Sequence, residues 1–139
     1  MKALSPADLK QTRKRTYVIV AIQLILATAF IFRPATYLPR EGYIFYQSYY
    51  ADVMIPFGFY FLLCINDKNF PFLRNWKIRA ALIFTGATLT EVLQYFGIYA
   101  LGVTFDPFDI VAFAIGTIMA VLVDRLLFPR VFSFWEIKK

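Results

Sequence analysis

The segment TEVLQYFGIYALGVTFDPFDIVAFAIG, residues Thr90–Gly116, joins two strongly apolar stretches and places three carboxylates among them. Glu91 lies inside the first apolar stretch, whereas Asp106 and Asp109 stand at the start of the second. An ionisable side chain inside a membrane helix is costly and is usually functional or specifically paired. The segment therefore predicts two membrane helices with a group of carboxylates near the end where they meet.

The composition indicates a membrane protein rather than a soluble domain. Of 139 residues, 60% are hydrophobic, 19% are aromatic and 17% are charged. A bilayer core of about 30 Å requires about 20 mostly apolar residues per helix. The expected fold is all-α, a polytopic membrane protein with a bundle of four transmembrane helices. This single transmembrane domain covers residues 1–139, with spans at about 16–32, 49–65, 78–101 and 108–128.

The distribution of basic residues predicts the orientation of the bundle. Of the 15 Lys and Arg, all but Arg33 and Arg40 lie in the N-terminal tail, the loop between the second and third spans, or the C-terminal end. Because Lys and Arg near helix ends stay on the cytoplasmic side, both termini are expected in the cytoplasm and the protein in the cell membrane. The same distribution accounts for the net charge of +6, so the lipid bilayer is the expected partner and nucleic acid is not.

The first apolar run follows basic residues, as in a secretory signal peptide, and residues 27–29 offer a small-residue cleavage pattern. Because the run continues through Ile31 and Phe32, we expect it to remain as an uncleaved membrane helix. The single cysteine, Cys64, cannot form an intrachain disulfide.

The polar residues of the apolar stretches are expected to gather in the outer half of the bundle. Glu91 lies about 18 Å along its helix from Arg79, and Gln94 lies on the same face one turn further out. Asp52 and Asp109 enter their helices from the outer side. The predicted ligand-binding residues, around one outward-facing pocket, are Asp52, Glu91, Gln94, Asp106 and Asp109. We predict no cofactor and assign no metal ligands.

Helix capping is an alternative explanation for the aspartates. Asp52 and Asp109 are expected in first helical turns, where unpaired N–H groups favour negative charge. Asp106 precedes Pro107, a pattern typical of an N-cap followed by proline at the first helical position. Glu91 has no comparable explanation, unless it is protonated and hydrogen-bonded to a neighbouring helix or to the glutamine one turn away.

Asp124 lies beside Arg125 at the cytoplasmic edge, and we expect it to form an interfacial ion pair or to be solvated. In the fourth predicted span, small residues recur every four positions, at 112, 116 and 120, and such a stripe allows another helix to approach closely. In the second span, Pro56 is expected to bend the helix and widen the pocket.

The segment between the first two spans is rich in tyrosine. It suits an aromatic belt at the level of the lipid headgroups, since tyrosine has an apolar ring and a hydroxyl that favours water. The alternative is a stacking surface for a sugar or peptide ligand. Of the nine tyrosines, five lie here: Tyr37, Tyr43, Tyr46, Tyr49 and Tyr50.

The order of the polar residues resembles the VanZ-like family of small membrane proteins, over roughly residues 49–128. That family has an acidic residue opening an early helix, E-x-x-Q in a later helix, and a glycine-led outer loop. An aspartate then opens the last helix, with a glycine below it. The corresponding residues here are Asp52, Glu91 with Gln94, Gly102, Asp109 and Gly116. Val103 and Phe113 stand where the family pattern has an arginine and an asparagine. The resemblance implies a role in the cell envelope, because the named member is associated with resistance to a glycopeptide antibiotic.

The outer half then contains more acidic than basic residues, so protons, a cation or a cationic ligand is expected to complete the site. The leading hypothesis is a non-enzymatic envelope protein that binds an outer-leaflet ligand, such as a lipid-linked sugar, a peptide or a glycopeptide. One alternative is a small transporter, a cation- or proton-coupled carrier that uses Glu91. Another is an accessory subunit with membrane protein partners. An enzyme with two carboxylates as acid and base is less favoured, because the chain has no histidine and one cysteine.

Overall fold

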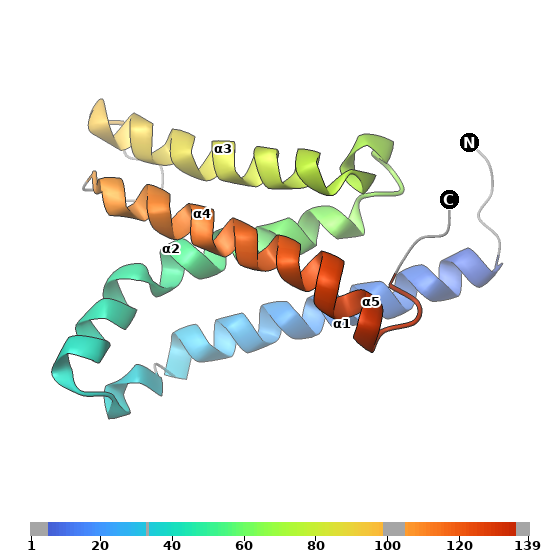
Figure 1. The fold of residues 1–139 in the computed structure, drawn as a ribbon, viewed down its shortest axis with the longest axis horizontal. Coiled ribbons are helices and arrows are strands. Elements are labelled where there is room, and N and C mark those ends of the chain that lie inside the picture. Colours follow the sequence, from blue (N-terminus) through green and yellow to red (C-terminus); the bar gives the residue numbers. More distant parts are fainter. Residues whose placement is uncertain (1–5, 33, 99–104, 136–139) are drawn as a thin grey trace.

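The computed structural model describes residues 6–32, 34–98 and 105–135, and within these ranges it contains helices and no strand. The long helices are α1 (Pro6–Phe32), α2 (Arg40–Ile65), α3 (Trp76–Tyr95) and α4 (Pro107–Leu122) (Figure 1). The predicted all-α fold class is therefore confirmed for these residues. The short elements are η1 (Pro34–Tyr37), η2 (Pro71–Arg74), the π-helical turn η3 (Val123–Leu127) and α5 (Phe128–Val131).

Among the described residues, three helical segments are long and apolar enough to cross a membrane: Asp8–Phe32, Arg40–Ile65 and Pro107–Val131. They contain the first, second and fourth predicted spans and extend beyond each of them. The third predicted span, about 78–101, falls on α3, which is not among these segments. The reason is its polar content, since α3 carries Arg79, Glu91 and Gln94, and all three side chains are buried within the protein.

Helix α3 also ends earlier than the sequence pattern predicts. It stops at Tyr95, and Gly97 adopts a positive φ of 77°. The Gly97 N–H donates to the Gln94 carbonyl at 2.9 Å, and the Ile98 N–H donates to the Leu93 carbonyl at 2.9 Å. This is the Schellman arrangement, in which a glycine closes a helix by turning the chain back. The remainder of the predicted span, residues 99–101, lies outside the described residues.

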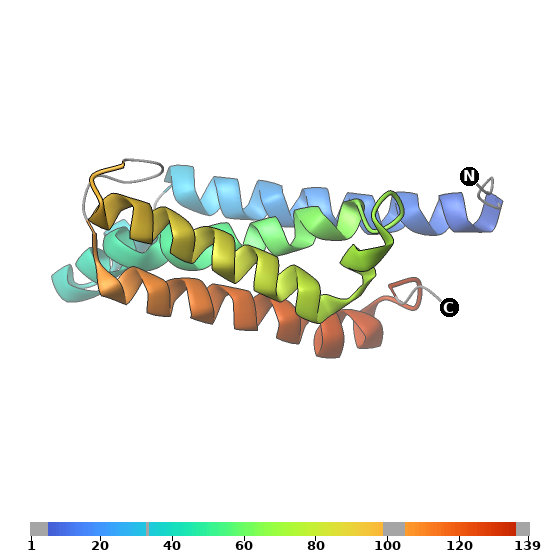
Figure 2. The same cartoon turned by 90° about the horizontal axis from the view of Figure 1, so that it is seen from above.

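Helix α2 is the centre of the bundle and packs against α1, α3 and α4 (Figures 1 and 2). Helices α2 and α4 pack so tightly at Gly116 that a Cβ there would collide with the carbonyl oxygen of Val53. Ala112 and Ala120, one turn to either side, are also buried. The small-residue stripe therefore acts as predicted, because it lets the backbones of α2 and α4 approach each other closely.

The first half of α2 is held to α1 by hydrogen bonds from α2 side chains to backbone carbonyls of α1. The Tyr46 hydroxyl donates to the Ala29 carbonyl at 2.9 Å, and the Tyr50 hydroxyl donates to the Leu26 carbonyl at 3.1 Å. Four of the five clustered tyrosines thus belong to α2, which begins at Arg40, and not to a loop before a shorter helix. Tyr46 and Tyr50 hold α2 to α1, a structural role that neither the aromatic-belt nor the stacking-surface interpretation predicted.

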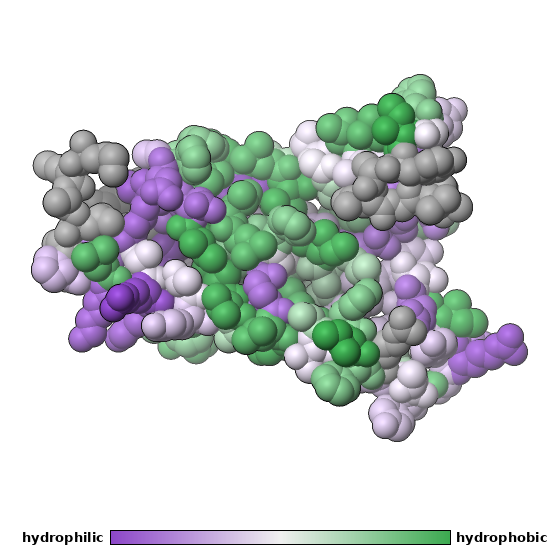
Figure 3. Space-filling view, turned by 180° about the vertical axis from the view of Figure 1, so that it is seen from behind, coloured by the Kyte–Doolittle hydropathy of each residue, from purple (hydrophilic) through white to green (hydrophobic). Residues whose placement is uncertain are grey.

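Apolar side chains form a broad band across the middle of the face seen in Figure 3, and hydrophilic side chains gather toward the end where α1 begins. The core lies nearer that end, because its buried residues include Ile19 of α1, Tyr60 and Phe61 of α2, and Trp135. The opposite end of the bundle, where α3 stops and α4 starts, contains a hollow lined by both carboxylates and apolar residues. We call this end the outer end and the end where α1 begins the inner end, after the orientation that the basic residues predict.

Candidate functional site

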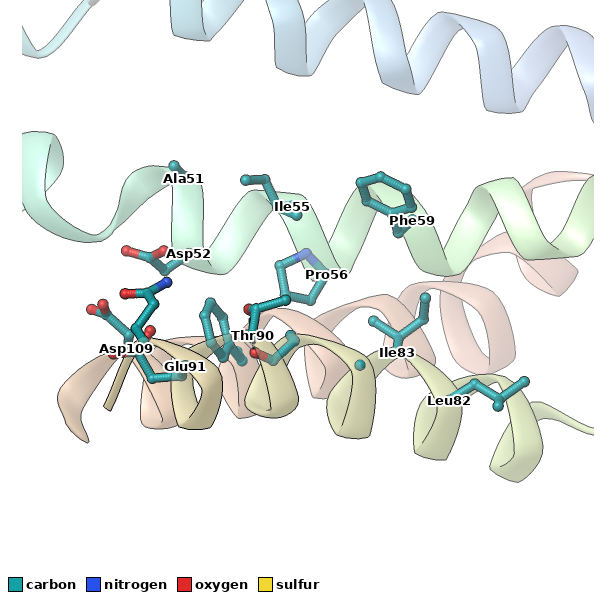
Figure 4. Close-up of a pocket in the computed structure, with 14 residues that line it drawn as sticks. Ala51, Asp52, Ile55, Pro56, Phe59, Leu82, Ile83, Thr90, Glu91 and Asp109 are labelled. Carbon is teal, nitrogen blue, oxygen red and sulfur yellow. Dashed lines mark hydrogen bonds between the residues drawn. The ribbon is translucent and has the colours of Figure 1, made fainter. Parts of the chain in front are cut away.

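Four of the five predicted site residues line one pocket between α2, α3 and α4 (Figure 4). Asp52 comes from α2, Glu91 and Gln94 from α3, and Asp109 from α4, and the pocket has a volume of about 400 Å³. The close-up shows Asp52, Glu91 and Asp109 at the same end of this hollow. The fifth residue, Asp106, lies next to the pocket but not among the residues that line it. Sequence spacing thus led to side chains that three separate helices bring together.

Glu91 joins α3 to the beginning of α4. Its side chain is buried, with 2% of its surface exposed, and its Oε1 atom accepts a hydrogen bond of 2.6 Å from the backbone N–H of Asp106. The first N–H groups of a helix have no partner within the helix, and a carboxylate is a favourable acceptor there. One carboxylate oxygen of Glu91 therefore caps the start of α4, and the Glu91 side chain also lines the pocket.

Asp106 is the N-cap of α4. Its Oδ1 atom accepts a hydrogen bond of 2.9 Å from the Phe108 N–H, and Pro107 occupies the first helical position behind it. Asp109 lies in the first turn of α4, and its own N–H donates to the Asp106 carbonyl at 3.0 Å. The capping interpretation is confirmed for Asp106. Asp109 also has the predicted place in the first turn, but its carboxylate is directed to the pocket (Figure 4).

The placement of Asp52 at the start of a helix is wrong. Helix α2 begins at Arg40, so Asp52 lies more than three turns inside a helix that has no break there. The helix dipole at the N-terminus, which acts over one turn, cannot account for its charge. Pro56 follows one turn later, is buried and lines the same pocket. Because proline has no N–H, α2 cannot make the usual hydrogen bond from residue 56 to the Asp52 carbonyl.

The pocket is electrostatically one-sided. Asp109 lies close enough to Asp52, Glu91 and Asp106 to be influenced by the charge of each. None of the described residues that line the pocket is Lys or Arg. In the described part of the chain, no three His, Cys, Asp or Glu residues are grouped closely enough to hold a metal ion. The arrangement suits a larger positively charged group that several carboxylates approach from different sides.

A second polar cluster lies near the opposite end of α3 and was missed by sequence reasoning. Arg79 of α3 forms an ion pair with Asp124 of η3, with 2.6 Å between Nη2 and Oδ2. The Tyr60 hydroxyl donates to the same Oδ2 atom at 2.8 Å, and the Trp135 indole N–H donates to Oδ1 at 2.8 Å. Both charged residues are about 95% buried. The expectation of a solvated Asp124 is therefore wrong, whereas the expected ion pair is present, with Arg79 of another helix as its partner.

The π-helical turn explains how Asp124 reaches this position. Residues Val123–Leu127 form the turn between α4 and α5, and Asp124 is buried there while its neighbour Arg125 is exposed. A π-helical turn shifts the direction of the following side chains relative to an unbroken α-helix. The sequence signal was the presence of Arg79 and Asp124, two ionisable residues near membrane-span ends, but each was assigned to the orientation rule or to the interface.

A buried pair of Arg15 and Asp67 extends the inner cluster toward α1. Nη1 of Arg15 lies 2.8 Å from Oδ2 of Asp67, and the Arg15 guanidinium lies 5.1 Å from the centre of the Trp135 ring. Trp135 therefore contacts one member of each ion pair, Arg15 and Asp124, and its ring also packs on Phe61 of α2.

Comparison with models of known protein families, with curated proteins and with solved structures found no match to this chain.

Proposed function

We propose that this chain is a VanZ-like membrane protein of the cell envelope that binds an outer-leaflet ligand in the pocket between α2, α3 and α4. One observation carries the proposal: Asp52, Glu91, Gln94 and Asp109, from three helices, line a single hollow of about 400 Å³. Ligand pockets typically combine an apolar wall with a few convergent polar groups, and this hollow has both. The resemblance of these residues to the VanZ-like pattern supports the same site.

The proposal includes four membrane spans with both termini in the cytoplasm. Helix α3 has 20 residues, and at about 1.5 Å per residue it is about as long as a bilayer core is thick. Its buried Arg79, Glu91 and Gln94 would then face other helices and not lipid, as ionisable residues in spans usually do. Of the described Lys and Arg, all but Arg40 lie toward the end of the bundle where α1 begins, and this distribution supports the orientation.

The ligand of this proposal is an envelope molecule of lipid-linked or glycopeptide type that presents a positive group to the carboxylates. Enzymatic chemistry receives less support, because the chain has no histidine and its single cysteine, Cys64, is buried beside the inner cluster. Transport also receives less support. The pocket lining between the two polar clusters consists of residues such as Phe59, Leu82 and Ile83, which offer no path for a charge.

The proposal is tested with the variants Asp52→Asn, Glu91→Gln and Asp109→Asn, singly and combined, in a cell that lacks the wild-type chain. The measurements are the binding of a labelled glycopeptide to the purified proteins and the sensitivity of the cells to envelope stress. The matched control is Glu41→Gln, an exposed carboxylate in the first turn of α2 that lies outside the pocket. We expect the pocket variants to lose both properties while accumulating normally in the membrane, and the control to retain them.

Unchanged binding and unchanged stress sensitivity in the combined variant would overturn the proposal. Flux of cations into proteoliposomes that depends on Glu91 would instead establish the carrier alternative. Purification in mild detergent separates the remaining possibility, since an accessory subunit would leave the membrane with its partners bound.

A further inference from the structure

The pocket continues from its carboxylates into an apolar trough between α2 and α3. We define this trough by Ile55 and Phe59 of α2 and by Leu82, Ile83, Gly86 and Ala87 of α3, all of which line the pocket. In Figure 4 the labelled members extend away from Asp52 and Asp109 toward the other end of α3. Leu82 and Glu91 are nine residues apart on α3, so the trough runs about 14 Å along the helix.

The trough is open on the side of the bundle. Phe59 and Leu82 at its edges have 54% and 49% of their surface exposed. A Cβ added to Gly86 would meet no atom within 4 Å, so the wall of the trough is open space at that point. An empty apolar hollow forfeits dispersion contacts, and in a bilayer the surrounding molecules that can restore them are hydrocarbon chains. The trough therefore suits an alkyl chain.

The polar end of the pocket selects the head group of that chain. Asp52, Glu91 and Asp109 approach from three helices, and the described lining offers no Lys or Arg to an anionic head. A metal ion is not favoured, because the carboxylates are not grouped closely enough in the described residues to hold one. A protonated amine is larger, donates up to three hydrogen bonds, and matches several separated acceptors.

We infer that the pocket binds an amphiphile whose protonated amine lies among Asp52, Glu91 and Asp109 and whose hydrocarbon chain lies in the apolar trough. This inference rests on the proposed function and names the chemical class of its ligand. Lipid tails are as apolar as the trough, so the ligand's hydrocarbon chain fills the trough without distinguishing the ligand from bilayer lipids. The protonated amine of the ligand provides that selectivity.

The experiment uses the full chain in nanodiscs of zwitterionic lipid and three probes. Dodecylamine has both the amine and the chain, propylamine has the amine alone, and dodecyl sulfate joins the same chain to an anion. Binding to empty nanodiscs is subtracted. The variant Gly86→Leu places a side chain in the trough, at a position where an added Cβ meets no atom within 4 Å. Thr85→Leu adds the same side chain at the exposed neighbouring position outside the pocket.

For the wild-type chain we expect dodecylamine to bind more tightly than propylamine, and dodecyl sulfate not to bind above the empty nanodisc. Gly86→Leu should weaken dodecylamine binding about tenfold, because an extra side chain in a filled site forces its occupant out, and should leave propylamine unchanged. The combined Glu91→Gln and Asp109→Asn variant should weaken both amines by about tenfold or more. Thr85→Leu should change neither.

Failure of this inference is distinct from failure of the proposed function. Equal binding of dodecylamine to wild type and Gly86→Leu, or tight binding of dodecyl sulfate, overturns the amphiphile assignment even if the carboxylate variants still abolish glycopeptide binding and stress resistance. If the carboxylate variants leave both amines and both of those properties unchanged, the pocket is not the site and the proposed function falls with it.

Discussion

The two ends of α3 carry polar clusters that are built on opposite principles. At the inner end, Arg79 and Asp124 neutralise each other, and Tyr60 and Trp135 donate to the remaining carboxylate positions. At the outer end, Asp52, Glu91 and Asp109 share a charge sign and surround a hollow of about 400 Å³. The charges of the inner cluster are compensated within the protein. The negative charges of the outer cluster are not compensated by any described Lys or Arg in the lining of the pocket.

Burial alone does not distinguish a structural carboxylate from a ligand-binding one, since Glu91 is as deeply buried as Asp124. The presence or absence of a compensating positive charge distinguishes the two clusters. Buried charges are tolerated where they are paired and hydrogen-bonded. In the inner cluster both carboxylate oxygens of Asp124 accept hydrogen bonds, and only Nε of its partner Arg79 is buried without an acceptor among the described residues. A cluster of like charges beside a hollow destabilises the fold unless protons, a cation or a ligand compensates the charge. We therefore expect stability to depend on the inner cluster and binding to depend on the outer one.

The largest effect on stability is expected from Arg79→Ala. It leaves the Asp124 carboxylate buried without its ion-pair partner, which costs about 3–5 kcal/mol of unfolding free energy. Unfolding of the purified protein in mixed micelles measures this loss. The double variant Arg79→Leu with Asp124→Leu is the control, because it removes both charges and fills the space, and it should be more stable than Arg79→Ala. A single variant as stable as wild type would contradict the contrast between the clusters.

The second prediction compares the stability of alanine variants at two glycines. One lies between packed helices, and the other lines the pocket. Gly116→Ala should lower the unfolding free energy by about 1–3 kcal/mol, because its Cβ meets the Val53 carbonyl and pushes α2 and α4 apart. Gly86→Ala should raise it by up to about 1 kcal/mol, because alanine favours a helix and the added methyl meets nothing. The same micelle unfolding experiment measures both. Equal responses would mean that the pocket is packed in solution.

The sequence predicted much of the outer site because each of its residues breaks a strong local pattern. A glutamate within an apolar run, a glutamine one turn later, and Asp-Pro before a helix are visible without any knowledge of packing. Helix boundaries were less accessible, since Arg40–Ile65 forms one helix through a segment of polar and aromatic residues that local composition separates into loop and span. Tertiary hydrogen bonds from Tyr46 and Tyr50 to α1 support that helix, and no local pattern reports them.

The inner cluster could not be found in the same way. Its partners lie far apart in the sequence, with Arg79 and Asp124 separated by 45 positions. Each residue alone fits a simpler explanation, because basic and acidic side chains near the ends of spans commonly contact water or headgroups. The π-helical turn that directs Asp124 inward has no recognised signal in the segment VDRLL.

The smallest effect on stability is expected from Glu91→Gln, although the residue is 2% exposed. The amide oxygen can still accept the hydrogen bond from the Asp106 N–H, and removal of one negative charge relieves repulsion from Asp52 and Asp109. We expect the unfolding free energy to change by less than about 1 kcal/mol. Glu91→Ala, in contrast, should cost about 2 kcal/mol or more, because it leaves that N–H without its acceptor and opens a cavity. A Glu91→Gln variant as unstable as Glu91→Ala would mean that the charge itself holds α3 to α4. The outer cluster would then be structural like the inner one.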